Sequence, residues 1–144
     1  MFDKFFSFSE DTKKEIIEKI KNILIQEEYI VFAYIFGSFA YSDRFNDIDI
    51  AIYIKDSPKD KESILKLELE LERKVEDKIN IPTDVRLINN APLGFVYNVL
   101  SNKIVIIDRD IDLRADFESL IFRKYFDYKH LIEEYLREIK NAPI

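Results

Sequence analysis

Residues 47–54 read DIDIAIYI and form the clearest strand pattern in the chain. Successive side chains of a strand point to opposite faces, so Asp47 and Asp49 share one face and the four isoleucines share the other. The Cα atoms of the two aspartates are then about 6.6 Å apart. At an effective dielectric of 20, two like charges 6 Å apart repel by about 3 kcal/mol. A divalent cation would turn this repulsion into ligation, and Mg²⁺ prefers one or two carboxylates together with substrate phosphates. The alternative is that Asp47 caps a turn and Asp49 faces solvent on an edge strand, and an isolated Asp-x-Asp favours it.

A glycine stands where the preceding strand ends. Residues 29–36 (YIVFAYIF) are a continuous apolar run, which predicts a central strand buried on both faces, and Gly37-Ser38 follow it. The chain has only two glycines, and glycine allows a positive φ and a close approach of backbone to a ligand. A short helix beginning at Ser38 would offer N–H groups and its dipole to an anion such as a triphosphate. The alternative is a plain turn between a strand and a helix.

Asp84 is the candidate for a third acid. It lies in residues 82–88 (PTDVRLI), which alternate like a strand, with Arg86 on the same face. If this strand lies beside residues 47–54, three carboxylates reach one face and could support in-line transfer at phosphorus, with two acids holding the metal and the third accepting a proton. If it does not, Asp84 and Arg86 form a surface ion pair.

The remaining patterns alternate between helical and extended, which predicts an α/β or α+β domain. We expect helices at 10–27, 58–79, 91–100 and about 112–140, and a further short strand at 104–107. Ser9 or Thr12 is the expected cap of the first helix, Ser57-Pro58 of the second, and Asn89 or Asn90 of the third. The acidic run from Glu68 to Glu76 is expected to be a solvated helix face.

Composition limits the possible functions. The 144 residues, expected to be one domain, carry a net charge of −6, which argues against a dedicated nucleic-acid binder. Cysteine is absent, which excludes disulfides and thiolate metal sites and is typical of a reducing cytosol. No apolar run reaches the roughly 18 residues that a membrane span requires. We therefore expect a cytoplasmic protein without membrane or direct nucleic-acid contacts.

The predicted helix at about 112–140 is longer than the domain needs. Its length would be near 42 Å, against a diameter of about 37 Å for a compact chain of this size. Apolar and aromatic residues cover more than one stripe of it. Either it is a core helix with a wide apolar face, or its second face meets another chain.

The order of these motifs resembles the nucleotidyltransferase superfamily. The matching residues are GSFA at 37–40, DIDI at 47–50 and TDVRL at 83–87. The resemblance implies a polymerase-β-like fold, with a small mixed sheet flanked by helices. Residues 89–100, residues 104–110 and the long terminal helix are similar to the MntA antitoxins of HepT–MntA toxin–antitoxin systems.

The MntA resemblance implies an antitoxin that transfers AMP from ATP to a tyrosine hydroxyl of a HEPN-domain RNase toxin, HepT-like, in a hetero-oligomer. Gly37 and Ser38 match the phosphate-binding motif. Asp47, Asp49 and Asp84 match the catalytic, Mg²⁺-binding acids. Two other functions stay open: an antitoxin that acts by binding alone, and a small-molecule nucleotidyltransferase of the aminoglycoside type.

The loop after the Gly-Ser pair differs from the family pattern. Tyr41-Ser42 stand where the family usually has Arg-Gly, and the segment 39–46 is shorter than usual. Arg44 is either a replacement cation for the phosphates or a solvated loop arginine.

Overall fold

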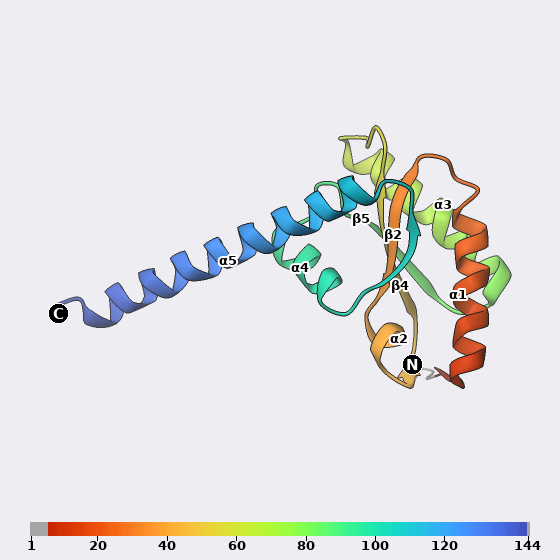
Figure 1. Ribbon diagram of the computed structural model, residues 1–144, viewed down its shortest axis with the longest axis horizontal. Helices are drawn as coiled ribbons and strands as arrows, with labels where there is room; N and C mark the ends of the chain where they lie inside the picture. The colour runs from red at the N-terminus through yellow and green to blue at the C-terminus, as the bar shows by residue number, and fades with distance from the viewer. Residues whose placement is uncertain (1–5, 144) are drawn as a thin grey trace.

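The computed structural model describes residues 6–143 and shows a mixed α/β architecture (Figure 1). In chain order the elements are β1 (Phe6–Ser7), α1 (Glu10–Leu24), β2 (Ile30–Phe36), α2 (Ser38–Tyr41), β3 (Arg44–Phe45), β4 (Ile48–Ile54), α3 (Lys61–Ile79), β5 (Thr83–Leu87), α4 (Leu93–Ser101), β6 (Ile104–Asp108) and α5 (Ile111–Asn141). The predicted strands and helices are confirmed apart from their ends. The two-residue strands β1 and β3, which pair with each other, were not predicted because they are too short to show a period.

The four longer strands form one sheet in the order β5-β4-β2-β6. β2 is antiparallel to both β4 and β6, whereas β4 and β5 are parallel and are connected through α3. This order places the strand of Asp84 beside the strand of Asp49, which is the condition on which the sequence argument for a third acid depended.

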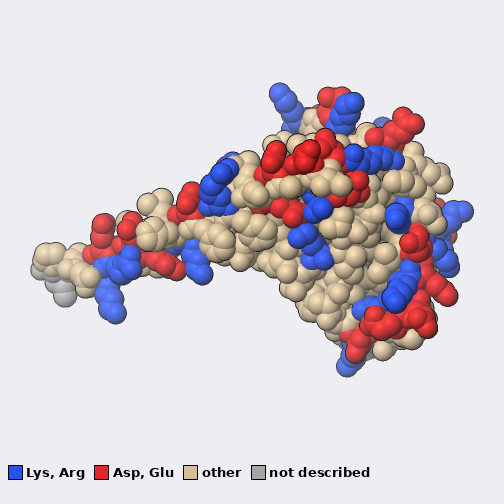
Figure 2. Space-filling model, viewed as in Figure 1, with Lys and Arg blue, Asp and Glu red and all other residues tan. Residues whose placement is uncertain are grey.

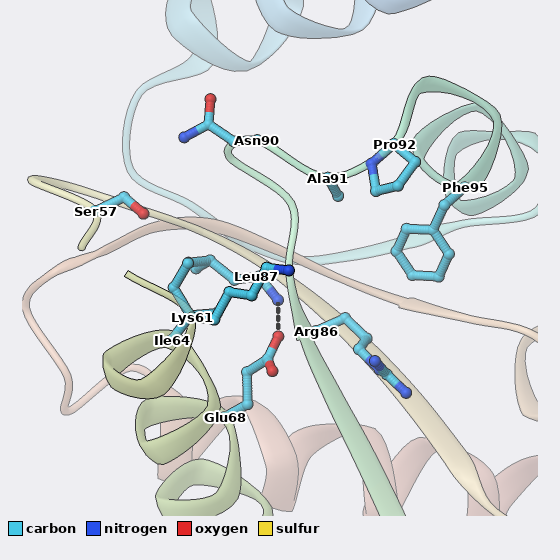
Figure 3. A pocket seen from close by; sticks show the side chains of 10 residues that line it. All are labelled: Ser57, Lys61, Ile64, Glu68, Arg86, Leu87, Asn90, Ala91, Pro92 and Phe95. Atoms are coloured by element: carbon cyan, nitrogen blue, oxygen red, sulfur yellow. Dashed lines mark hydrogen bonds between the residues drawn. The ribbon is translucent and has the colours of Figure 1, made fainter. Parts of the chain in front are cut away.

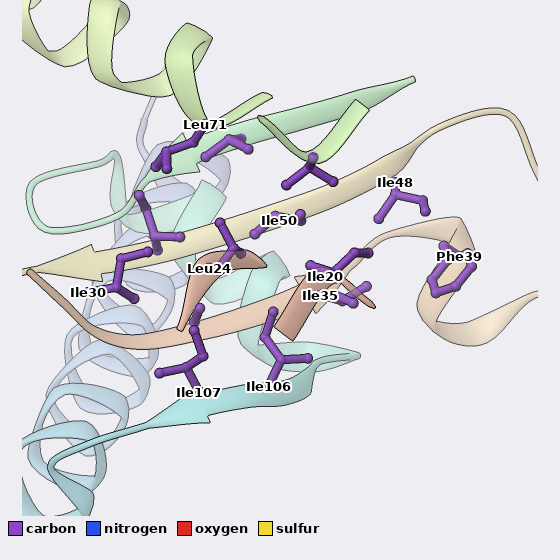
Figure 4. Close-up of a cluster of buried hydrophobic side chains, with 14 of the residues drawn as sticks. Ile20, Leu24, Ile30, Ile35, Phe39, Ile48, Ile50, Leu71, Ile106 and Ile107 are labelled. Atoms are coloured by element: carbon purple, nitrogen blue, oxygen red, sulfur yellow. The ribbon is translucent and has the colours of Figure 1, made fainter. Parts of the chain in front are cut away.

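Each face of the sheet carries its own apolar cluster. The isoleucines of β4 point to the face covered by α1 and α3, where they pack with Ile20, Leu24 and Leu71 (Figure 4). Phe32, Tyr34 and Ala51 point to the other face, under α4 and the beginning of α5. β2 is therefore buried on both sides, as its continuous apolar run predicts.

The helix caps differ in part from those expected. The Ser9 hydroxyl caps α1 by accepting from the Thr12 N–H at 3.2 Å. Asp60, not Ser57, caps α3, and its carboxylate accepts from the Ser63 N–H at 2.9 Å. The prediction of Ser57-Pro58 was wrong because an aspartate three residues later is an equally good cap.

Asn89 caps no helix. It exchanges two hydrogen bonds with the backbone of Ile54, at 2.9 and 2.8 Å. These bonds tie the end of β4 to the segment that follows β5. α4 begins after Pro92 without a side-chain cap.

The outer edge of β5 is covered by glutamates of α3. Glu68, Glu72 and Glu76 accept hydrogen bonds from backbone N–H groups at 2.9, 2.9 and 2.8 Å, and the donors are Leu87, Val85 and Thr83 respectively. The glutamates are four residues apart on the helix, a rise of about 6.0 Å, and the N–H donors are two residues apart on the strand, a rise of about 6.6 Å. Because the two spacings are nearly equal, each glutamate meets one donor. The expectation of a solvated face was wrong for these three residues, because an edge strand presents unpaired amides that need acceptors.

The helix α5 begins on the sheet and then leaves it (Figure 1). Phe117, Ile121 and Phe122 pack on the second apolar cluster, and the Tyr34 hydroxyl donates to Glu118 at 2.6 Å. Tyr125 stacks on Tyr97 of α4 with ring centroids 3.6 Å apart. We call residues 126–141 the distal helix; they project from the domain with charged and uncharged side chains mixed along their length (Figure 2).

Candidate active site

The candidate acids lie at one end of the sheet. The Cα atoms of Phe36, Asp49 and Asp84 form a row across β2, β4 and β5, in which Asp49 is the register partner of both neighbours. Asp47 immediately precedes β4. The structure therefore brings together the end of β2, where Gly37 follows, and the three aspartates that the sequence identified.

Gly37 lies directly against the carboxylate of Asp49. Its φ of 75° is in the region that favours glycine. A Cβ atom placed on Gly37 would stand 2.2 Å from Asp49 Oδ2, far inside van der Waals contact. The absence of a side chain at residue 37 is thus what allows the bend after β2 to approach the second aspartate. α2 follows at once, with Ser38 as its first residue.

The charges of the three acids influence one another. Partial burial, followed by the charges of Asp47 and Asp84, raises the pKa of Asp49 to about 6, against a partly opposing effect of Arg86. Burial and the charge of Asp84 also raise the pKa of Asp47. Both shifts mean that negative charge is held here at a cost in free energy, which a bound cation would relieve.

Besides the other aspartates, the charged side chains of Arg86 and Glu72 lie near Asp84. Its carboxylate accepts from Arg86 Nε at 3.1 Å, so the ion pair expected as an alternative is present as well. Asp84 also lies near Glu72, whose pKa is raised by burial and then by the charge of Asp84. The two interpretations of Asp84 are therefore compatible: it lies close to Asp47 and Asp49 and also pairs with the guanidinium of Arg86.

The donor set suits a hard divalent cation. Asp47 and Asp49 offer carboxylate oxygens on a crowded, partly buried surface, and the carboxylate of Asp49 lies next to the backbone of Gly37. Within residues 6–143, no three His, Cys, Asp or Glu side chains are gathered closely enough to hold a metal ion by themselves. Mg²⁺ usually takes one or two carboxylates and completes its shell with water and substrate phosphates. The residues present fit a magnesium ion of this kind.

The short loop 39–46 is held by aromatic packing and by one buried lysine. Phe39 and Phe45 are buried and meet edge to face, with ring centroids 4.7 Å apart. Lys13 of α1 places its ammonium 5.0 Å from the Phe39 ring centroid and donates to the Ser42 carbonyl at 2.7 Å. The ammonium thus sits at the C-terminus of α2, where a cation is favourable.

Lys13 was not identified from the sequence, although a signal is present. It stands three residues before Ile16 and seven before Ile20, and therefore on the buried stripe of α1. A lysine in that position requires a partner for its charge. Arg44, the other cation considered for this loop, lies on β3 with its side chain exposed, and its backbone N–H donates to the Ser42 hydroxyl at 3.2 Å.

Comparison with known families shows which family the residues carrying these motifs match. The model of the family described as "Polymerase beta, Nucleotidyltransferase" matches residues 18–112, about two thirds of the chain. This range contains the Gly-Ser pair and all three aspartates. No curated protein matches the sequence.

Solved structures with a similar fold come from toxin–antitoxin complexes. One is from the complex of a tri-AMPylated Shewanella oneidensis HEPN toxin with its MNT antitoxin, with a TM-score of 0.62 and 20% identity over 90% of this chain and 97% of that chain. Another, from the toxin–antitoxin complex MntA-HepT, has a TM-score of 0.61 and 19% identity over 89% and 97%. A third, from a toxin–antitoxin with AMP-PNP, has a TM-score of 0.62 and 21% identity over 87% and 96%. At these identities the likeness shows a shared fold.

Proposed function

The chain belongs to the polymerase beta nucleotidyltransferase family, and we propose that it is an antitoxin that transfers AMP from ATP to a tyrosine hydroxyl of a HEPN-domain toxin. The observation that carries the proposal is the contact between the bend at Gly37 and the carboxylate of Asp49, with Asp84 beside it in register. A nucleotide would bind where the bend and the acids meet, with its phosphates beside both. The complexes in which the similar folds occur, with an AMPylated toxin and with an ATP analogue, support this choice of substrate and partner.

The roles that we propose for the residues are consistent with their positions across the sheet. Gly37 and Ser38 bind the β- and γ-phosphates through the backbone of the bend and the Ser38 hydroxyl. Asp47 and Asp49 would hold Mg²⁺, which would supply Lewis-acid stabilisation of the charge on the phosphates. Asp84, held by Arg86, accepts the proton of the attacking hydroxyl. The oxygen of that hydroxyl forms a bond to the α-phosphorus, the bond from the α-phosphorus to the bridging oxygen breaks, and pyrophosphate leaves on the side of Gly37.

The distal helix is the proposed binding element for the toxin. Apolar residues recur at helical spacing along one side of it, and each is between 39% and 64% exposed; they are Tyr128, Leu131, Ile132, Tyr135, Leu136 and Ile139. This stripe continues the face that Phe117, Ile121 and Tyr125 use to pack on the domain. A helix face that is apolar beyond the end of its own core is typical of a surface that another helix covers.

Within residues 6–143, no helix combines the length and apolar character that crossing a bilayer requires. We place the protein in the cytoplasm, where ATP, Mg²⁺ and an RNase toxin with its RNA substrates meet.

The enzymatic proposal is tested with Asp49→Asn. Asparagine keeps the size of the side chain but loses its charge, so transfer of AMP to the toxin should fall by more than the roughly 10–100-fold typical of losing an outer-shell metal contact. Binding of the toxin should be unchanged, because Asp49 lies on β4 inside the sheet, whereas the distal helix projects from the domain (Figure 1). Incubation with labelled ATP, Mg²⁺ and the toxin, followed by mass measurement of the toxin's tyrosine peptides, gives the result. Equal transfer by wild type and variant would remove the assigned role of Asp49.

Neutralisation by binding alone is the second candidate, and the exposed stripe of the distal helix favours it. The double substitution Leu131→Glu and Leu136→Glu should abolish toxin binding, whereas Arg137→Glu, on the opposite side of the same helix, should not. Substitution is preferable to truncation after residue 116, because residues 117–125 belong to the core. If Asp49→Asn neutralises the toxin as well as wild type does, and the double variant does not, binding alone is the mechanism.

A further inference from the structure

A pocket of about 530 Å³ lies at the C-terminal end of β5. Its walls come from the beginning of α3 and from the segment that joins β5 to α4 (Figure 3). The lining is largely apolar, from Ile64, Leu87, Ala91, Pro92 and Phe95. Lys61 and Arg86 contribute cations, and Glu68 contributes a carboxylate that accepts a hydrogen bond from the N–H of Leu87 at 2.9 Å.

The order of the strands sets the side from which the acceptor enters. Gly37 follows β2, Asp49 lies on the adjacent β4, and Asp84 lies on β5 at the edge of the sheet. In an in-line displacement the attacking and leaving oxygens are on opposite sides of the phosphorus. If pyrophosphate leaves on the side of Gly37, the attacking hydroxyl arrives on the side of β5.

Arg86 connects this entry side to the pocket. Its Nε holds the carboxylate of Asp84 at 3.1 Å, and the same residue lines the pocket. The two residues lie two positions apart on β5, on the same face of the strand. The pocket and the acceptor side of the proposed active site therefore share Arg86.

We propose that this pocket binds the acceptor segment of the partner protein, holding an apolar or aromatic side chain that neighbours the target tyrosine. The pocket is large enough to bury such a side chain. Anchoring it beside Asp84 would bring the adjacent hydroxyl to the general base, which is how binding remote from the reacting atoms promotes a transfer. The inference rests on the proposed function and adds to it the site that selects the protein substrate.

The test fills the pocket without removing any of its groups. Ala91→Trp adds a large side chain to the lining, and Asn98→Trp adds the same side chain at an exposed position of α4 outside the pocket. Steady-state AMP transfer is measured with each full-length variant, varying the HEPN-domain toxin at saturating ATP and then ATP at saturating toxin. For Ala91→Trp we expect the KM for toxin to rise about tenfold, equivalent to 1.4 kcal/mol, with the KM for ATP unchanged. Asn98→Trp should match wild type in both constants.

Each other outcome contradicts the inference in a distinguishable way. A higher KM for ATP with an unchanged KM for toxin would assign the pocket to the nucleobase. Unchanged constants would show that the pocket takes no part. Wild-type protein that transfers no AMP to the toxin would refute the proposed function itself, and the inference with it.

A second pair of variants covers the case in which Ala91→Trp does not fold. Ile64→Ala enlarges the pocket, whereas Leu65→Ala shortens an exposed side chain of the same helix that does not line it. For Ile64→Ala we expect a higher KM for toxin with an unchanged KM for ATP, and for Leu65→Ala we expect both constants to match wild type. An unchanged KM for toxin in Ile64→Ala would overturn the proposal.

Discussion

Glu72 of α3 accepts a hydrogen bond from the backbone N–H of Val85, with 2.9 Å between Oε1 and N. Glu68 and Glu76, one turn away on either side, do the same for Leu87 and Thr83. The edge of β5 is therefore closed by side chains, which leaves less backbone free to pair with another strand. Because Glu72 also lies near Asp84, the same helix both closes the sheet and adds negative charge beside the proposed site.

The first prediction concerns this hydrogen bond. Glu72→Ala should lower the free energy of unfolding by about 1–3 kcal/mol, the cost of leaving a partly buried donor without its acceptor. Glu72→Gln should lose less, because its amide oxygen can still accept from Val85. Glu70→Ala, an exposed position of the same helix, should change the free energy little. Urea denaturation of the three variants measures the difference, and equal losses for Glu72→Ala and Glu70→Ala would show that the bond does not stabilise the fold.

The second prediction compares the two glycines of the chain. Gly37→Ala would place a methyl group 2.2 Å from Asp49 Oδ2 at a φ of 75°, so it should abolish AMP transfer and destabilise the fold. Gly94→Ala meets no atom within 4 Å, and in α4 it should be neutral or stabilising by about 0.5–1 kcal/mol. Thermal denaturation and the transfer assay of both variants check this. Full activity of Gly37→Ala would mean that the bend does not contact the nucleotide.

The third prediction is a dependence of stability on pH. The pKa of Asp49 in the folded protein is about 6, above the value of 3.8 expected for the unfolded chain. Folding is therefore weakened as Asp49 ionises, and the penalty is absent below pH 3.8 and complete above about pH 6.

Asp49→Asn removes this penalty. In the absence of divalent cations it should be more stable than wild type by on the order of 1 kcal/mol at about pH 8, after allowance for solvent screening of a partly exposed group. The difference should disappear at about pH 4. Thermal denaturation across this range measures it, and a variant less stable than wild type at the higher pH would contradict the crowding of charge at the site.

The fourth prediction concerns the buried lysine. Lys13→Met keeps an unbranched side chain of similar length but loses the hydrogen bond to the Ser42 carbonyl and the charge near Phe39. Stability should fall by about 1–2 kcal/mol, and the KM for ATP should rise because the loop after Gly37 is no longer held. Lys19→Met, at an exposed position of α1, is the matched control. A loss of stability without any change in the KM for ATP would give Lys13 a structural role only.

The elements of this chain were predictable because their patterns are local. The alternation of residues 47–54 predicts which side chains share a face, and the uninterrupted apolar run of residues 29–36 predicts burial on both sides; the structure confirms both. The Gly-Ser pair and the three aspartates could be identified in the same way, from residue types and their order. The cap of α3 was predicted wrongly because several adjacent residues can cap equally well.

Relations between distant segments required the tertiary structure. Nothing in the sequence states that β5 lies next to β4, that a Cβ at residue 37 would collide with Asp49, or that three glutamates of α3 meet three amides of β5. Lys13 needed the fold for the same reason, since its partner Ser42 is 29 residues away.

The sequence alone determined the longer strands, the long helices and the residues proposed for phosphoryl chemistry, because each depends on side-chain periodicity and type within a few neighbouring positions. The tertiary structure alone decided which of these residues meet, where the pocket beside Arg86 lies and how far α5 extends beyond the core. Those properties depend on the order of strands in the sheet and on packing between segments far apart along the chain, for which a local pattern holds no information.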